Sequence, residues 1–102
     1  MSSTIMVTYE IKPLLKEVHV GLINEVFAQL KIAKLENFDY KVLCSNDGMI
    51  FTHISTFQSE DGTNPVSQLK AFQNFGSSLQ DRVVSPPKAE SVTLIGNYTV
   101  QV

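Results

Sequence analysis

Hydrophobic and polar residues along this 102-residue chain follow two different periods. Four segments alternate with a period of two, which is typical of β-strands, and two segments repeat apolar residues every three to four positions, which is typical of helices. In chain order we expect a strand at residues 5–12, a helix at 14–34, strands at 38–45 and 49–58, a helix from 65 to about 83, and a strand at 90–102. This order predicts one α+β domain over residues 1–102, a ferredoxin-like β-α-β-β-α-β sandwich with a four-stranded antiparallel sheet.

Turn-forming residues stand where these segments meet. Pro13 closes the first strand and suits the first turn of the following helix, because proline donates no ladder hydrogen bond. The segment Asn46-Asp47-Gly48 is a hairpin signal between two strands. Asn64-Pro65 is a good helix start, and Ser85-Pro86-Pro87 stops that helix before the last strand.

The first helix carries one apolar stripe. Its members recur at helical spacing: Leu15, Val18, Leu22, Ile23, Val26, Phe27 and Leu30. His19 stands beside Val18, and no partner for it can be named from the sequence. We therefore expect His19 on the surface of the helix.

The two faces of the predicted sheet are both partly apolar. One alternating class has the character of a core: Ile5, Val7, Tyr9, Val42, Phe51, Phe57, Val92 and Leu94. The opposite class mixes threonines with large apolar residues: Met6, Leu43, Ile50, Ile54 and Ile95. Two helices cover only one face of such a sheet, and each large buried side chain contributes roughly 1.5–3 kcal/mol. We therefore expect a homodimer whose sheets meet face to face.

Composition narrows the classes of partner. The formal charge is −2 and the pI about 5.5, without a basic stripe, so we expect no nucleic-acid partner. No apolar run is long enough to span a membrane, and the first residues lack the layout of a signal peptide. The single cysteine, Cys44, excludes an internal disulfide, and we expect a packed thiol and a cytoplasmic location. No ligand spacing among His, Cys and carboxylate residues indicates a metal site.

Three segments give the chain a resemblance to a known family. They are Val-Thr-Tyr-Glu-Ile-Lys-Pro at 7–13, Asp-Gly-Met-Ile-Phe-Thr-His-Ile at 47–54, and Asn64-Pro65 opening a helix that contains Phe-Gln-Asn-Phe at 72–75. The layout resembles the dimeric α/β-barrel superfamily and is similar to the antibiotic-biosynthesis monooxygenase family. The resemblance implies a dimeric α/β barrel with a cleft between sheet and helices. Family members use that cleft for cofactor-free oxidation of aromatic polyketides or for haem degradation.

This chain departs from that family in two ways, and both weaken the interpretation of the chain as an enzyme. The haem-degrading branch uses an Asn, Trp and His set, and this chain has no Trp. Many relatives carry an acidic residue near the middle of the third strand, whereas residues 51–57 contain no carboxylate. We accordingly expect no cofactor.

Five residues are candidates for a site. His53 lies in the middle of a strand and is a candidate general base, because histidine titrates near neutral pH; the alternative is a structural histidine bonded to a neighbour. Tyr9, Tyr40 and Tyr98 fall in the more apolar class and could orient a planar ligand, or be core aromatics. Asn74 flanks the apolar stripe of the second helix and could add a polar contact.

Two functions of different classes therefore stay open. The first is a small monooxygenase-like enzyme that oxidises a flat apolar molecule in the sheet–helix cleft without a cofactor, with His53 as the base and a tyrosine as the orienting donor. The second is a non-catalytic homodimer, stress-related or binding a small apolar ligand.

Overall fold

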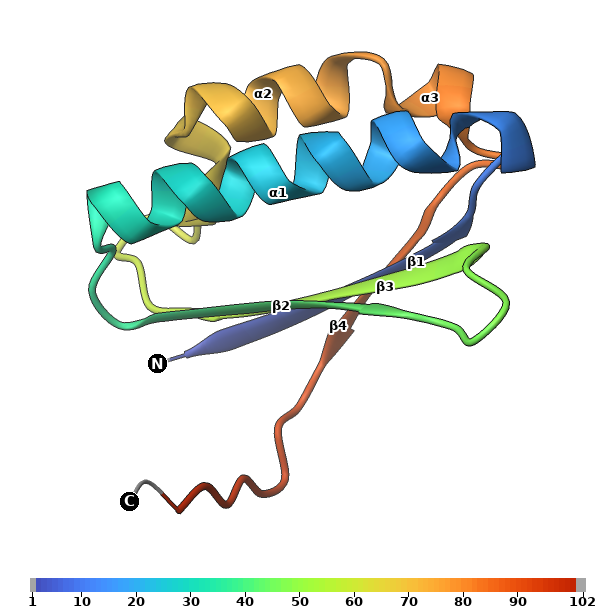
Figure 1. Cartoon of the computed structure of the whole chain (residues 1–102). Helices are drawn as coiled ribbons and strands as arrows, with labels where there is room; N and C mark the ends of the chain where they lie inside the picture. Colours follow the sequence, from blue (N-terminus) through green and yellow to red (C-terminus); the bar gives the residue numbers. More distant parts are fainter. Residues whose placement is uncertain (1, 101–102) are drawn as a thin grey trace.

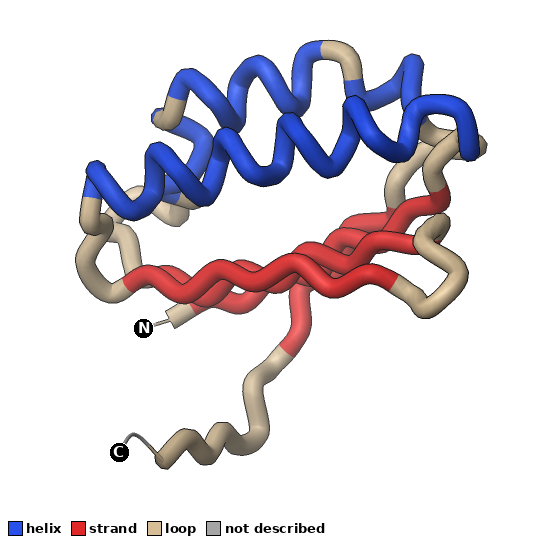
Figure 2. The backbone as a smooth tube through the Cα atoms, viewed as in Figure 1, coloured by secondary structure: helices blue, strands red, loops and turns tan. Residues whose placement is uncertain are grey.

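Four antiparallel strands form one sheet, and the helices lie together on one side of it (Figures 1 and 2). The structure is a computed structural model that describes residues 2–100. Its strands are β1 (Ser3–Glu10), β2 (Phe38–Cys44), β3 (Ile50–Phe57) and β4 (Lys88–Val92). They are arranged in the order β2-β3-β1-β4, with each neighbouring pair antiparallel. The predicted α+β, ferredoxin-like fold is confirmed.

The helical layer consists of one long helix and several short ones. Its elements are the 3₁₀ turn η1 (Pro13–Leu15), α1 (Lys16–Ala33), the 3₁₀ turn η2 (Pro65–Gln68), α2 (Lys70–Ser77) and α3 (Leu79–Arg82). Within the described residues, none of these helices is long and apolar enough to cross a membrane.

The second predicted helix is divided where Leu69 adopts an extended conformation, with φ −77° and ψ 133°. The start of α2 is stabilised from outside, because the side-chain oxygen of Gln29 on α1 accepts a hydrogen bond from the Ala71 backbone N–H at 2.9 Å. The first N–H groups of any helix lack partners within it, so this contact supports a new helix start at that point. At the front of η2, Asn64 accepts a hydrogen bond from the Val66 N–H at 3.2 Å, as its predicted capping role requires.

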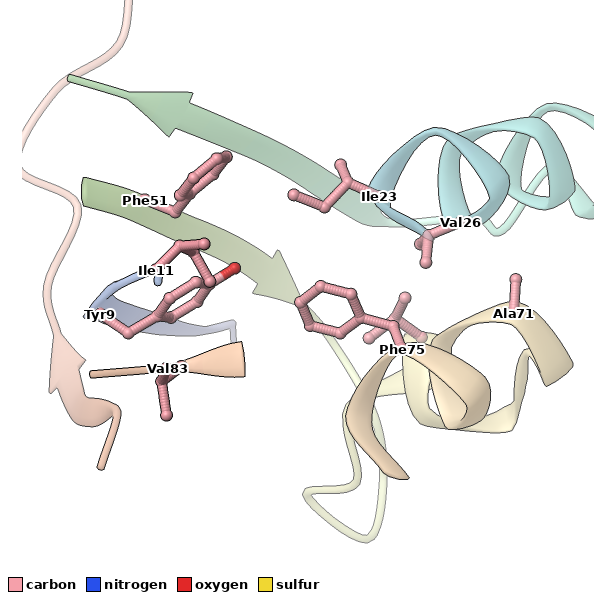
Figure 3. Packing of buried hydrophobic residues seen from close by; sticks show 9 residues of the cluster. Tyr9, Ile11, Ile23, Val26, Phe51, Ala71, Phe75 and Val83 are labelled. Atoms are coloured by element: carbon pink, nitrogen blue, oxygen red, sulfur yellow. The ribbon is translucent and has the colours of Figure 1, made fainter. Parts of the chain in front are cut away.

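The core lies between the sheet and the helices (Figure 3). Strand pairing places Tyr9 opposite Phe51 and Val7 opposite His53, so these side chains share the face that the helices cover. The buried apolar cluster is Tyr9, Ile11, Ile23, Val26, Phe51, Val66, Ala71, Phe75 and Val83. The alternation of β1 and β3 therefore gave the correct core face.

The stripe on α1 differs from the prediction by one position. His19 is 0% exposed and Val18 is 58% exposed, so the expectation of a surface histidine was wrong. The buried positions are His19, Ile23 and Val26, which keep the i, i+4, i+7 spacing of one helix face. A histidine can occupy this buried position because both of its ring nitrogens are hydrogen-bonded.

The last strand is shorter than predicted. β4 ends at Val92, which pairs with Thr4, and because β1 begins at Ser3 there is almost no partner strand left beyond this point. Residues 93–100 form no helix or strand and run away from the sheet (Figures 1 and 2). The pairing with Thr4 puts Val92 on the face away from the helices, and Leu94 is exposed, so neither is the core residue we expected. Residues 101–102 of the predicted strand lie outside the described residues.

Candidate functional site

A row of five polar side chains crosses the core, each from a different element. Arg82 Nε of α3 lies 3.0 Å from His19 Nδ1 of α1, and His19 Nε2 lies 2.7 Å from the Tyr9 hydroxyl oxygen of β1. The same hydroxyl lies 2.5 Å from His53 Nε2 of β3, and His53 Nδ1 lies 2.6 Å from the Tyr40 hydroxyl oxygen of β2. We call these five residues the Arg82–Tyr40 network.

Strand register explains how three of its members meet. His53 pairs with Val7 on one side and with Val42 on the other. Tyr9 and Tyr40 each stand two residues from those partners, so both are diagonal neighbours of His53 on the same face of the sheet. Long aromatic side chains reach across such diagonals.

Burial sets the charge of the network. It lowers the pKa of both histidines from 6.5 to about 4, helped for His19 by the positive charge of Arg82 and for His53 by the neighbouring His19. Burial also raises the pKa of the Tyr9 and Tyr40 hydroxyls, so both stay protonated. At neutral pH the histidines and tyrosines are therefore neutral, and Arg82 carries the charge.

An apolar cavity of about 150 Å³ borders one end of the network. Tyr9, Tyr40 and His53 form part of its wall, and the rings of Phe72 and Phe75 form another part. An apolar cavity of about this size is large enough for a benzene ring. The arrangement offers a ring-sized apolar space beside a tyrosine hydroxyl that is supported by a buried histidine.

A second polar pair lies in the same wall. The Asn64 side-chain amide donates a hydrogen bond to the Ser55 hydroxyl at 2.9 Å, and both residues line the cavity. Asn64 was expected only as a helix cap, and it fills that role as well.

Three of the five predicted site residues are brought together, namely Tyr9, Tyr40 and His53. Tyr98 is 86% exposed in the segment after β4, and it does not line the cavity. Asn74 is exposed on α2, because Ala71 and Phe75 take the buried face of that helix. The cavity wall within a single chain therefore does not include Tyr98 or Asn74, and their ligand contacts stay predictions.

Sequence reasoning missed His19 and Arg82. His19 had a usable signal, because it stands four residues before Ile23 and seven before Val26 on one helix face. Arg82 had none, since an arginine after an aspartate near a helix end is typical of a solvated surface. Cys44 is exposed at the end of β2, contrary to the expected packed thiol. Across residues 2–100, no group of three or more His, Cys, Asp or Glu residues is arranged to hold a metal ion.

Neither protein-family models nor curated proteins match this sequence. Solved structures do match. Rv0793 from Mycobacterium tuberculosis has a TM-score of 0.77 and 9% identity, over 97% of this chain and 100% of that one. A Nitrosomonas europaea protein assigned as an antibiotic biosynthesis monooxygenase has a TM-score of 0.75 and 14% identity, over 92% and 90%. A Caulobacter crescentus protein with the same assignment has a TM-score of 0.74 and 13% identity, over 93% and 91%.

This chain has the antibiotic biosynthesis monooxygenase-like fold. The resemblance stated from the sequence is thus confirmed for the fold. At identities of 9–14% the similarity concerns the fold alone, so activity must be argued from the cavity and the network.

Proposed function

We propose that this protein binds a flat, mainly apolar small molecule in the cavity and promotes its oxidation by O₂ without a cofactor. The observation that carries the proposal is the contact between a ring-sized apolar cavity and the buried Tyr40–His53 pair. The similarity in fold between this chain and proteins assigned as monooxygenases supports oxidation by O₂ as the reaction class.

Tyr40 is the residue that we place against the substrate. A hydroxyl that donates to a carbonyl oxygen makes an adjacent C–H bond more acidic and stabilises the enolate that forms when the proton of that bond passes to solvent water. Both nitrogens of His53 are bonded to tyrosine hydroxyls, so neither is free to accept that proton directly. We therefore assign His53 the role of positioning Tyr40, in place of the base role expected from the sequence.

Oxindole is a suitable probe because it is small, flat and mainly apolar and carries an acidic CH₂ group next to its carbonyl. Its oxidation by one O₂ replaces both hydrogens of that carbon by one oxygen atom, and the second oxygen leaves as water. We expect the purified protein to accelerate O₂ uptake and isatin formation in the absence of added metal or flavin.

Tyr40→Phe should abolish this acceleration while the protein stays folded. Tyr98→Phe is the matched control, because Tyr98 is exposed outside the cavity and should react like the parent protein. O₂ uptake equal to that without protein would instead favour the second candidate, a non-catalytic protein that binds a small ligand in the same cavity.

We also propose that the chain works as a homodimer. The sheet face away from the helices exposes Leu43 and Ile50, and the segment after β4 exposes Leu94 and Ile95. Apolar groups that gather on one side of a small protein mark an interface. Native mass spectrometry should give a dimer that Ile50→Lys dissociates. Ile32→Lys, on the outer side of α1, should leave the dimer intact; a monomeric parent protein would refute the proposal.

A further inference from the structure

The hydrogen bonds of the Arg82–Tyr40 network run in one direction, and Arg82 sets that direction. A guanidinium has only donors, so the Arg82 Nε–H donates to Nδ1 of His19. A neutral imidazole carries one N–H, and on His19 it must therefore stand on Nε2. This N–H donates to the Tyr9 hydroxyl oxygen.

The direction continues to the cavity. Tyr9 receives a bond from His19, so it donates its own hydrogen to Nε2 of His53. The N–H of neutral His53 is thus on Nδ1, where it donates to the Tyr40 hydroxyl oxygen. Among residues 2–100, the Tyr40 hydroxyl has no other hydrogen-bond partner, so its own hydrogen has no protein acceptor. Tyr40 lines the cavity, and a ligand there can supply the acceptor.

The positive charge of Arg82 also favours an acceptor, and in particular an anion, in the cavity. Its side chain is buried, with 4% exposure, and its guanidinium donates to neutral acceptors: His19 Nδ1, the Ser78 hydroxyl at 2.5 Å and the Phe75 carbonyl at 2.6 Å. The ion pairs within residues 2–100 do not include Arg82. A buried positive charge is costly without a negative partner. An anion in the cavity would lie at the far end of a row of dipoles that this charge has aligned.

We infer that the cavity selects a ring with an acceptor oxygen, bound as a phenolate or enolate on the Tyr40 hydroxyl, and that Arg82 fixes this preference through His19, Tyr9 and His53. The inference deepens the proposed function and shares its ligand site. Tyr40 contacts the ligand, and Arg82 is a positioning residue that acts from outside the cavity.

The direction of the network can be measured without any ligand. Nitrogen chemical shifts of isotope-labelled protein report which ring nitrogen of each histidine carries hydrogen. We expect N–H at Nε2 of His19 and at Nδ1 of His53. The opposite tautomer at either histidine would overturn the inference. Arg82→Gln, which can accept as well as donate, should mix the tautomers, and Arg82→Lys, which can only donate, should restore them.

The ligand preference can be measured with a pair of probes of similar shape. 4-Nitrophenol ionises to a phenolate and changes colour when it does so, whereas 4-nitroaniline carries the same nitro group and a neutral amine in place of the ionisable hydroxyl. Binding of the anion at least about tenfold more tightly than the neutral form lowers the pKa of bound 4-nitrophenol by at least about one pH unit. We expect this shift in the parent protein and tight binding of 4-nitrophenol over 4-nitroaniline.

Variants at Tyr40 and Arg82 test separately the hydrogen bond to the ligand and the direction of the hydrogen bonds in the network. Tyr40→Phe should weaken binding of 4-nitrophenolate by about tenfold or more, as loss of a charge-assisted hydrogen bond predicts, and leave 4-nitroaniline unchanged. Arg82→Gln should lose the pKa shift although Tyr40 is present, and Arg82→Lys should recover it. If Arg82→Gln does not fold, the inference is still tested by the histidine tautomers of the parent protein and by the binding of 4-nitrophenolate to Tyr40→Phe. An unshifted pKa of 4-nitrophenol in the parent protein would overturn the inference.

The outcome is distinguishable from that of the proposed oxidation. Expected tautomers and a lowered pKa of 4-nitrophenol, with no O₂ uptake on oxindole, would uphold the anion site and refute the proposed oxidation. O₂ uptake with an unshifted 4-nitrophenol pKa would uphold the proposed oxidation and refute the anion site.

Discussion

Replacing Tyr9 by Phe would remove one oxygen atom from the centre of the Arg82–Tyr40 network and keep the ring. The ring stacks on Phe51 at a centroid distance of 5.9 Å and meets the edge of His19 at 5.2 Å, contacts that Phe can retain. The hydroxyl bonds Nε2 of both His19 and His53. The substitution therefore tests the hydrogen bonds apart from the packing.

The cost follows from what the missing oxygen leaves behind. The N–H of His19 loses its acceptor and Nε2 of His53 loses its donor, and both histidines are buried. A buried polar group without a partner costs about 1–3 kcal/mol, so with two such groups the free energy of unfolding should fall by roughly 2–6 kcal/mol. In a chain of this size, each kcal/mol of lost stability lowers the melting temperature by about 4–8 °C. The melting temperature of Tyr9→Phe should therefore drop by on the order of 10 °C or more.

Urea unfolding followed by circular dichroism, together with a thermal scan, measures both quantities. Tyr40→Phe is the matched control, because the Tyr40 hydroxyl has one bonded partner and the side chain is half-buried where water can reach it. It leaves only the Nδ1–H of His53 without an acceptor, so it should cost about 1–3 kcal/mol, less than Tyr9→Phe. A Tyr9→Phe protein within about 0.5 kcal/mol of the parent would refute the buried network.

Three further predictions concern pH, a helix start and a turn. The buried His19 and His53 have pKa values of about 4 against an ordinary 6.5, so the unfolded chain binds more protons between these values. Stability should be complete above about pH 6.5 and fall toward pH 4 by up to roughly 3 kcal/mol per histidine; urea titrations that show no loss would contradict this. Gln29→Ala should cost about 1 kcal/mol in urea unfolding by removing the acceptor for the Ala71 N–H, and Gln29→Glu should cost less. Gly48→Ala should lower the thermal midpoint through a cost of about 1–2 kcal/mol, because Gly48 has a φ of +80°; an unchanged midpoint would contradict that strain.

Strand periodicity located the sheet half of the site because a strand offers only two faces. Once Tyr9, Tyr40 and His53 were assigned to the apolar class, they had to share one face of the sheet, and antiparallel neighbours then bring them into contact. The helical half was harder. A helix face is a gradual angular sector, so a stripe centred on Val18 or on His19 fits the same apolar residues.

Two other features depended on information that one sequence does not contain. Arg82 reaches His19 across 63 positions, and only the packing of α3 against α1 makes that contact. The end of β4 depends on where β1 begins, since the alternation of residues 93–100 continues after its ladder partner has run out. Alternation predicts a strand only where another strand is available to pair with it.

The position of the network is itself an argument for function over stability. A buried ionic or polar group rarely stabilises a fold more than well-packed apolar residues of similar volume would. Here a chain of 102 residues gives five buried or half-buried positions of its small core to Arg, His and Tyr, including a guanidinium that has no carboxylate partner among residues 2–100. Each hydrogen bond serves to satisfy the previous group, until the last hydrogen, on Tyr40, is left at the wall of the cavity. In a purely structural network, the last hydroxyl could donate to a protein carbonyl. In this network the last hydroxyl, that of Tyr40, lies at the cavity, where a ligand oxygen would accept its hydrogen.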